Sequence, residues 1–144
     1  MFYLQTLYRA AVDGDIEALE LSLQNGADID YQTEDGWTAL MRAAWNGHLE
    51  ICRLLIDRGC KIDITNRGGQ TALMWAAWNG HLEICRLLID RGCKIDITEV
   101  YGLTALMWAA TYGHLEICRL LIDTGRSRMD SINGGCQVWT PGDL

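Results

Sequence analysis

The chain has 144 residues, the length of one domain if it folds as a single compact body. Hydrophobic residues make up 49% of it, an ordinary share, and no apolar run approaches the roughly 18 residues that a membrane helix needs. The net charge is −7, and the basic residues are interleaved with acidic ones, whereas phosphate binding requires clustered Lys and Arg. We therefore expect no membrane and no nucleic acid among its partners.

Residues 1–33 form a degenerate, low-identity first copy of a unit that the rest of the chain repeats. Two of its residues, Glu20 and Ser22, are polar and stand at the positions that Arg53 and Leu55 occupy in the next copy. Such replacements are typical of a terminal repeat whose outer face meets water. We therefore predict a capping repeat at the N-terminal end.

The next two copies, at residues 34–66 and 67–99, share a long string that differs only by Arg42 in the first against Trp75 in the second. The string starts at Thr38 and at Thr71, and a third copy starts at Thr104, so the starts are equally spaced. A constant period of this length predicts a stack of units, each of which buries its apolar face against the next.

Each full copy predicts two short helices and a connector. In the first full copy Thr38 is placed to N-cap the helix in TALMRAAW, and Gly47 to end it in the left-handed conformation. The second helix, in HLEICRLLID, is apolar around more than half of its circumference, so it requires cover on two sides. The residues that follow alternate apolar and polar and run into glycines, which predicts an extended, hairpin-like connector.

The third copy, residues 100–125, is truncated, and a divergent tail follows at residues 126–144. Gly135 stands one full period after Gly102, as a further connector would require. We expect the tail to form one more hairpin finger, with Trp139 covering the exposed apolar end of the third repeat. A disordered tail is the alternative, because Gly, Ser and Asp are frequent in it.

Six cysteines raise the question of disulfides, but five of them recur at two slots of the repeat. One slot holds Cys52, Cys85 and Cys118, and the other holds Cys60 and Cys93. Equivalent slots of stacked helices lie roughly 10 Å apart, whereas a disulfide needs Cα atoms within about 7 Å. We expect free, buried thiols and a reducing compartment, namely the cytoplasm, with the nucleus as the alternative.

His and Cys also recur four residues apart, as at His48 and Cys52, a spacing that can place two metal ligands on one helix face. Each copy supplies only two such ligands, and the apolar pattern turns the cysteine slot into the core. We therefore expect no metal and no cofactor. The chain has no nucleophile motif and no glycine-rich phosphate loop, so we do not expect an enzyme.

The recurring positions resemble the ankyrin repeat over about residues 2–125. In the first full copy the matching residues are Gly36, Thr38, Leu40, Ala43, Ala44, Asn46, Gly47, His48, Leu49, Glu50, Leu54, Leu55, Gly59, Ile62 and Asp63. The resemblance implies an all-α fold, an ankyrin-like α-solenoid of stacked helix-turn-helix repeats with hairpin-like connectors. One departure is Thr-Ala-Leu-Met where the family usually has Thr-Pro-Leu-His. In the family this histidine makes a polar contact between neighbouring repeats, and each such contact that is lost should cost on the order of 1 kcal/mol of stability.

The same resemblance implies a concave binding surface made of the first helices and the hairpin tips. Trp, Tyr and Arg are the residue types that dominate binding hot spots. The residues expected to contact a partner are Trp37, Arg42, Trp45, Asn46, Gln70, Trp75, Trp78, Asn79, Tyr101, Leu103, Trp108 and Tyr112. The alternative is that the indoles only fill space between adjacent helices, with Arg42 stacked on a ring.

We therefore expect a non-catalytic module that binds a protein or peptide through an aromatic-rich concave face, as a monomer with at most weak self-association. The competing hypothesis is a structural or decayed fragment of a longer repeat array, with no ligand of its own, that self-associates through an uncapped C-terminal edge. It is favoured by the near-identity of two copies, whose surfaces have diverged little, and by the missing polar cap at that edge.

Overall fold

The computed structural model describes residues 2–132, and all the regular elements in that range are helices. They are α1 (Phe2–Asp13), α2 (Ile16–Gln24), α3 (Ala39–Asn46), α4 (Leu49–Asp57), α5 (Ala72–Trp78), α6 (Leu82–Asp90), α7 (Ala105–Thr111) and α8 (Leu115–Ile132). Across this range no helix has both the length and the apolar character needed to cross a membrane.

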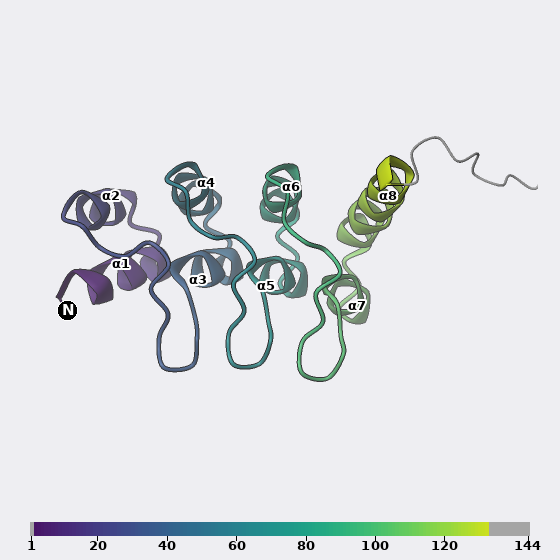
Figure 1. The fold of residues 1–144 in the computed structure, drawn as a ribbon, viewed down its shortest axis with the longest axis horizontal. Helices are drawn as coiled ribbons and strands as arrows, with labels where there is room; N and C mark the ends of the chain where they lie inside the picture. Colours follow the sequence, from purple (N-terminus) through teal and green to yellow (C-terminus); the bar gives the residue numbers. More distant parts are fainter. Residues whose placement is uncertain (1, 133–144) are drawn as a thin grey trace, which may run out of the picture.

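The helices lie in two rows, with long loops on one side (Figure 1). The first helices of the four pairs, α1, α3, α5 and α7, form one row in which each contacts the next. The second helices, α2, α4, α6 and α8, form the other row, and the loops project from the opposite side of the first helices. This arrangement confirms the predicted all-α solenoid of stacked helix pairs.

Threonine caps begin the first helix of each full repeat, as the sequence predicts. Each cap joins the threonine Oγ1 to the backbone N–H three residues later, at 3.2 Å for Thr38, 3.3 Å for Thr71 and 3.4 Å for Thr104. A cap of this kind typically contributes about 1 kcal/mol. At the other end of α3, Gly47 has φ of 78°, so the helix ends in the left-handed conformation that favours glycine.

Each long loop between pairs closes on itself as a narrow finger. A backbone bond from N–H to C=O crosses each finger, from Thr33 to Trp37 (3.0 Å), from Asn66 to Gln70 (3.1 Å) and from Glu99 to Leu103 (3.0 Å). Neighbouring fingers are joined in the same way, from Arg67 to Asp35 (2.9 Å) and from Val100 to Gly68 (3.0 Å). The fingers therefore form a hydrogen-bonded row beside the first helices, as hairpin-like connectors should.

A histidine ties each repeat to the one before it. The ring Nε2 lies within hydrogen-bond distance of a carbonyl oxygen in the preceding first helix, for His48 and Val12 (3.0 Å), His81 and Trp45 (2.9 Å), and His114 and Trp78 (2.9 Å). The alanine pair of α3, Ala43 and Ala44, is fully buried between the helices, so no bulk keeps them apart. Together these contacts set the stagger between successive repeats.

The N-terminal helix pair departs from prediction at Ser22. This residue is only 1% exposed, and its hydroxyl donates to the carbonyl of Ala18 at 2.8 Å. The prediction that it belongs to a polar outer face is wrong, because its slot faces the interior. The half-exposed Glu20 lies 3.9 Å from Arg58 of the next repeat. Among the described side chains of this pair, the apolar residues Ile16 and Leu21 are the ones exposed.

The last helix is longer than the sequence predicts. α8 runs through Gly125 and ends at Ile132, where a connector was expected, so that expectation is wrong for residues 126–132. Arg128 on this extension donates Nη1 to the carbonyl of Cys93 at 2.6 Å and Nη2 to that of Ile89 at 3.3 Å. These bonds hold the extension against the end of α6. The expected finger tip near Gly135 and the cap by Trp139 lie outside the described residues.

Candidate functional site

Five indoles and one phenol ring stack along the first helices. We call this set the aromatic ladder, and its members are Trp37, Trp45, Trp75, Trp78, Trp108 and Tyr112. Successive ring centroids are separated by 4.7 Å (Trp45 and Trp75), 5.0 Å (Trp75 and Trp78), 4.1 Å (Trp78 and Trp108) and 6.2 Å (Trp108 and Tyr112). Stacked pairs of this kind add about 0.5–1.5 kcal/mol each beyond the area they bury. The rings of the ladder therefore form one continuous stack that crosses three repeats.

The repeat geometry explains how the ladder forms. Trp75 and Trp78 are three residues apart on α5, so their rings project from one face of the helix. Near the end of α3, Trp45 occupies the position equivalent to Trp78. Its ring is nearly parallel to that of Trp75, at an angle of 5°. The carbonyls of Trp45 and Trp78 are the groups to which His81 and His114 bind. The histidine ties therefore also hold the ladder in place.

Exposure differs along the ladder. Trp75, one of the residues expected to contact a partner, is only 6% exposed and does not face outward, because Trp37, Trp45 and Trp78 cover it. Those three indoles and Trp108 are half-buried, and Tyr112 is 48% exposed. The ladder therefore has a structural centre at Trp75, whereas parts of the surrounding rings reach the surface.

Arg42 continues the ladder toward the N-terminal repeat. Its Cζ lies 4.2 Å from the ring centroid of Trp37 and 5.1 Å from that of Trp45, within cation–π range. Its Nε donates a hydrogen bond to the hydroxyl of Tyr8 on α1. Arg42 takes the slot of Trp75 in the next repeat, so a charge stands where that repeat has an indole.

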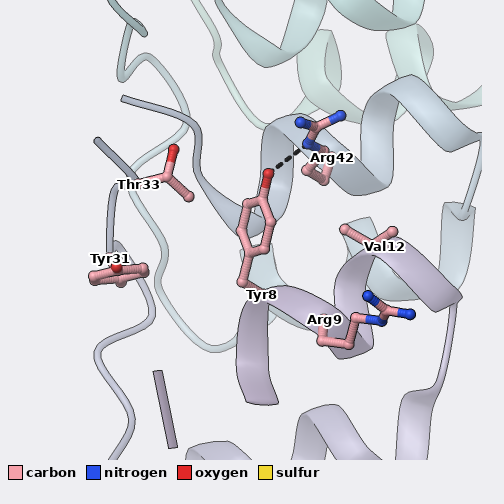
Figure 2. A pocket seen from close by; sticks show the side chains of 6 residues that line it. All are labelled: Tyr8, Arg9, Val12, Tyr31, Thr33 and Arg42. Carbon is pink, nitrogen blue, oxygen red and sulfur yellow. Dashed lines mark hydrogen bonds between the residues drawn. The ribbon is translucent and has the colours of Figure 1, made fainter. Parts of the chain in front are cut away.

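A cavity of about 700 Å³ opens beside Arg42. It is lined by Tyr8, Arg9, Val12, Tyr31, Thr33 and Arg42. Figure 2 shows the Tyr8 ring between the chain that carries Tyr31 and Thr33 and the helix that carries Arg42, with the Tyr8 hydroxyl directed at Arg42. Of these residues, only Arg42 is among those that the sequence predicts to contact a partner. The available signal was Tyr8, which stands at a slot that the three later copies fill with methionine.

The other expected contact residues lie at the helix ends and on the fingers. Asn46 and Asn79 are exposed, and their amides donate to the carbonyls of Val12 (3.3 Å) and Trp75 (3.2 Å). On the fingers, Gln70 accepts a hydrogen bond from the amide of Asn66 at 2.9 Å, Tyr101 is exposed and Leu103 is half-buried. The ladder and Arg42 form one contiguous group, to which the fingers contribute Trp37.

Four of the thiols lie buried in the interior, and the histidines make contacts between repeats. Burial raises the pKa of Cys52, Cys60, Cys85 and Cys93 to about 12 in each case. These four thiols are free and stay protonated at neutral pH, and each histidine Nε2 faces a carbonyl oxygen. Among residues 2–132 no three His, Cys, Asp or Glu side chains converge to hold a metal ion.

Comparison with protein families agrees with this architecture. A family model described as ankyrin repeats (3 copies) matches residues 7–99, which is more than half of the chain. A second model, described as ankyrin repeats (many copies), matches residues 80–122. A search of curated proteins gave no match. The two matches together span residues 7–122, which include all three fingers and most of the helix pairs. The chain therefore belongs to the ankyrin repeat family.

Proposed function

We propose that the chain is a non-catalytic module that binds a protein or peptide partner through the aromatic ladder. Ankyrin repeats generally act as protein–protein interaction modules, and they are typically non-catalytic. The observation that carries the proposal is the continuity of the ladder across three repeats, with partly exposed rings on either side of the buried Trp75. Aromatic rings of this kind supply large contact area at low entropic cost.

The stacking of the ladder supports tight binding by preorganisation. Each half-buried indole is already held by its neighbours, so a partner that covers it does not have to order a mobile side chain. The row of fingers runs beside the same helices (Figure 1), so a partner segment on the proposed face would lie against the first helices and the fingers. A segment that lies along this face would cross three repeats and contact Trp45, Trp78 and Tyr112 in turn.

The test begins with selection of twelve-residue random peptides on the immobilised chain. The affinity of the enriched peptides is then measured by fluorescence anisotropy for wild type, Tyr112→Ala, Trp78→Ala and Leu21→Ala. Tyr112 is exposed and its removal should leave the fold intact, and Leu21 is a matched exposed apolar residue on α2. We expect binding at least tenfold weaker for both ladder variants and unchanged for Leu21→Ala. The proposal is refuted if no peptide is enriched, or if both ladder variants bind as wild type does.

A second candidate function is self-association at the C-terminal end of the stack. Met107 is 47% exposed, whereas the equivalent Met41 and Met74 are 1% and 2% exposed because the next repeat covers them. Leu115 and Ile122 are also exposed, on α8, the helix that packs against α7. We propose that a second copy covers this apolar face when the chain is concentrated.

The mass of the full chain in solution, measured by light scattering over a hundredfold range of concentration, tests this candidate. We expect the apparent mass to rise with concentration in wild type and to stay at 16.2 kDa for Met107→Glu. A mass that does not depend on concentration in wild type would exclude self-association in that range.

We also propose that the chain works in a reducing compartment, namely the cytoplasm or the nucleus. The support comes from four buried, free thiols in the repeats. Alkylation of the protein at the moment of cell lysis should label these cysteines as thiols once the chain is unfolded. Recovery of disulfides at these positions would refute the compartment.

A further inference from the structure

Arg42 is the single difference between the two long matching strings, and its surroundings do not neutralise it. The side chain is half-buried against Trp37, yet no carboxylate of residues 2–132 lies within ion-pair distance of its guanidinium. A guanidinium has five N–H donors, and the hydrogen bond to the Tyr8 hydroxyl uses one of them. Arg42 thus has unused donors and a formal charge beside a cavity.

The cavity has the chemistry of a site for an anion. The described residues that line it carry two guanidinium groups and the hydroxyls of Tyr8, Tyr31 and Thr33, and none of them carries a carboxylate (Figure 2). The other cation, Arg9, is exposed and paired with Asp13 at 3.1 Å. The charge left to act on a ligand is therefore that of Arg42. Partial burial strengthens its attraction for a negative group relative to a fully exposed arginine.

We infer that this cavity receives an acidic side chain, Asp or Glu, of the protein or peptide segment that lies along the aromatic ladder. A carboxylate matches the fork of a guanidinium, with two parallel hydrogen bonds. The inference rests on the proposed function, because the guanidinium of Arg42 also contacts the ladder residues Trp37 and Trp45. A single carboxylate fits better than a polyanion, since the chain as a whole carries a net charge of −7.

This contact also gives the partner a direction and a register. The strings at residues 38–65 and 71–98 are identical apart from Arg42 and Trp75, so the rest of the two strings offers the same side chains twice. Within the described part of the chain, Arg42 is the cation in contact with the ladder, and it stands at the N-terminal end. An acidic residue seated at Arg42 therefore fixes which end of the segment lies over the first repeat.

The experiment uses the peptides enriched from the random twelve-residue library on the full chain. We expect an Asp or Glu at a common position among peptides selected on wild type, and no such preference among those selected on Arg42→Gln. For one enriched peptide, its acidic residue is replaced by the matching amide. This change should weaken binding to wild type at least tenfold and leave binding to Arg42→Gln unchanged. Arg67→Gln, which removes an exposed arginine of the next finger, is the matched control and should behave as wild type.

The outcomes separate this inference from the proposed function. Peptides that bind through the ladder without an acidic preference, or that lose equal affinity on wild type and Arg42→Gln, refute the inference and leave the proposed function standing. No enriched peptide at all refutes both. Displacement of the peptide by millimolar inorganic phosphate, with no effect of the carboxylate-to-amide change, would assign the cavity to a phosphate and also refute the inference. Circular dichroism on each variant confirms that it is folded.

Discussion

The histidine ties that hold the ladder in place can be tested through the glycines against which they pack. Gly80 has φ of +75°, and a Cβ added there would lie 2.7 Å from Cε1 of His114 and 2.8 Å from its Nδ1. Gly113 has nearly the same backbone, with φ of +73°, but a Cβ there would meet nothing within 4 Å. The pair therefore separates the cost of the left-handed backbone from the cost of displacing a histidine.

The expected magnitudes follow from these contacts. At Gly113 an alanine should cost about 1 kcal/mol, the usual penalty of a left-handed residue less the entropy that alanine removes from the unfolded chain. At Gly80 the ring of His114 must also move, which breaks its 2.9 Å bond to the Trp78 carbonyl and disturbs its packing. That adds about 1–2 kcal/mol, so Gly80→Ala should cost about 2–3 kcal/mol in total.

Urea unfolding followed by circular dichroism gives the free energy of unfolding for each variant. The decisive comparison repeats Gly80→Ala in a His114→Ala background, where its cost should fall to about 1 kcal/mol. An equal cost of Gly80→Ala in both backgrounds would refute the reasoning, because the imidazole would then play no part in the strain.

Two further predictions concern burial. Met74→Ala should lower the free energy of unfolding by about 3 kcal/mol, and Met107→Ala by less than about 1 kcal/mol, because Met74 is buried and Met107 is exposed. Equal losses in urea unfolding would contradict this and would mean that Met107 is covered. Burial raises the pKa of Cys85 from 9.0 to about 12, so its contribution to stability is complete below pH 9 and is lost between pH 9 and 12, as the unfolded thiol ionises first. Between pH 8 and 10, wild type should therefore lose about 1 kcal/mol more than Cys85→Ala does, and parallel pH profiles of the two chains would contradict this.

Much of the fold could be predicted from local patterns. The caps at Thr38 and Gly47 depend on residues a few positions apart, and the structure confirms both. The continuation of α8 could not be predicted in this way, because Gly125 ends no helix there although its counterparts follow the ends of α4 and α6. The extension is held by Arg128, whose bonds reach carbonyls 35 and 39 residues earlier in the chain. A distant contact of this kind overrides a local stop signal.

The candidate site, too, could be predicted from the sequence only in part. The spacing of Trp75 and Trp78 in the sequence is enough to predict that they share a helix face. It does not predict that Trp75 is buried among three other indoles. The cavity at Arg42 likewise joins α1, the first finger and α3. Its residues are ordinary when read singly, and only the stacking of the first two repeats brings them together.

The sequence by itself therefore determined the repeat, its helix pairs and its apolar stacking faces, because a constant period and the helical spacing of apolar side chains are local properties. The tertiary structure decided which aromatic rings are covered, which reach the surface, and which charge stands beside a cavity. Those outcomes depend on the stagger between successive repeats, and that stagger is set by buried alanines and by histidines that bind the preceding helix.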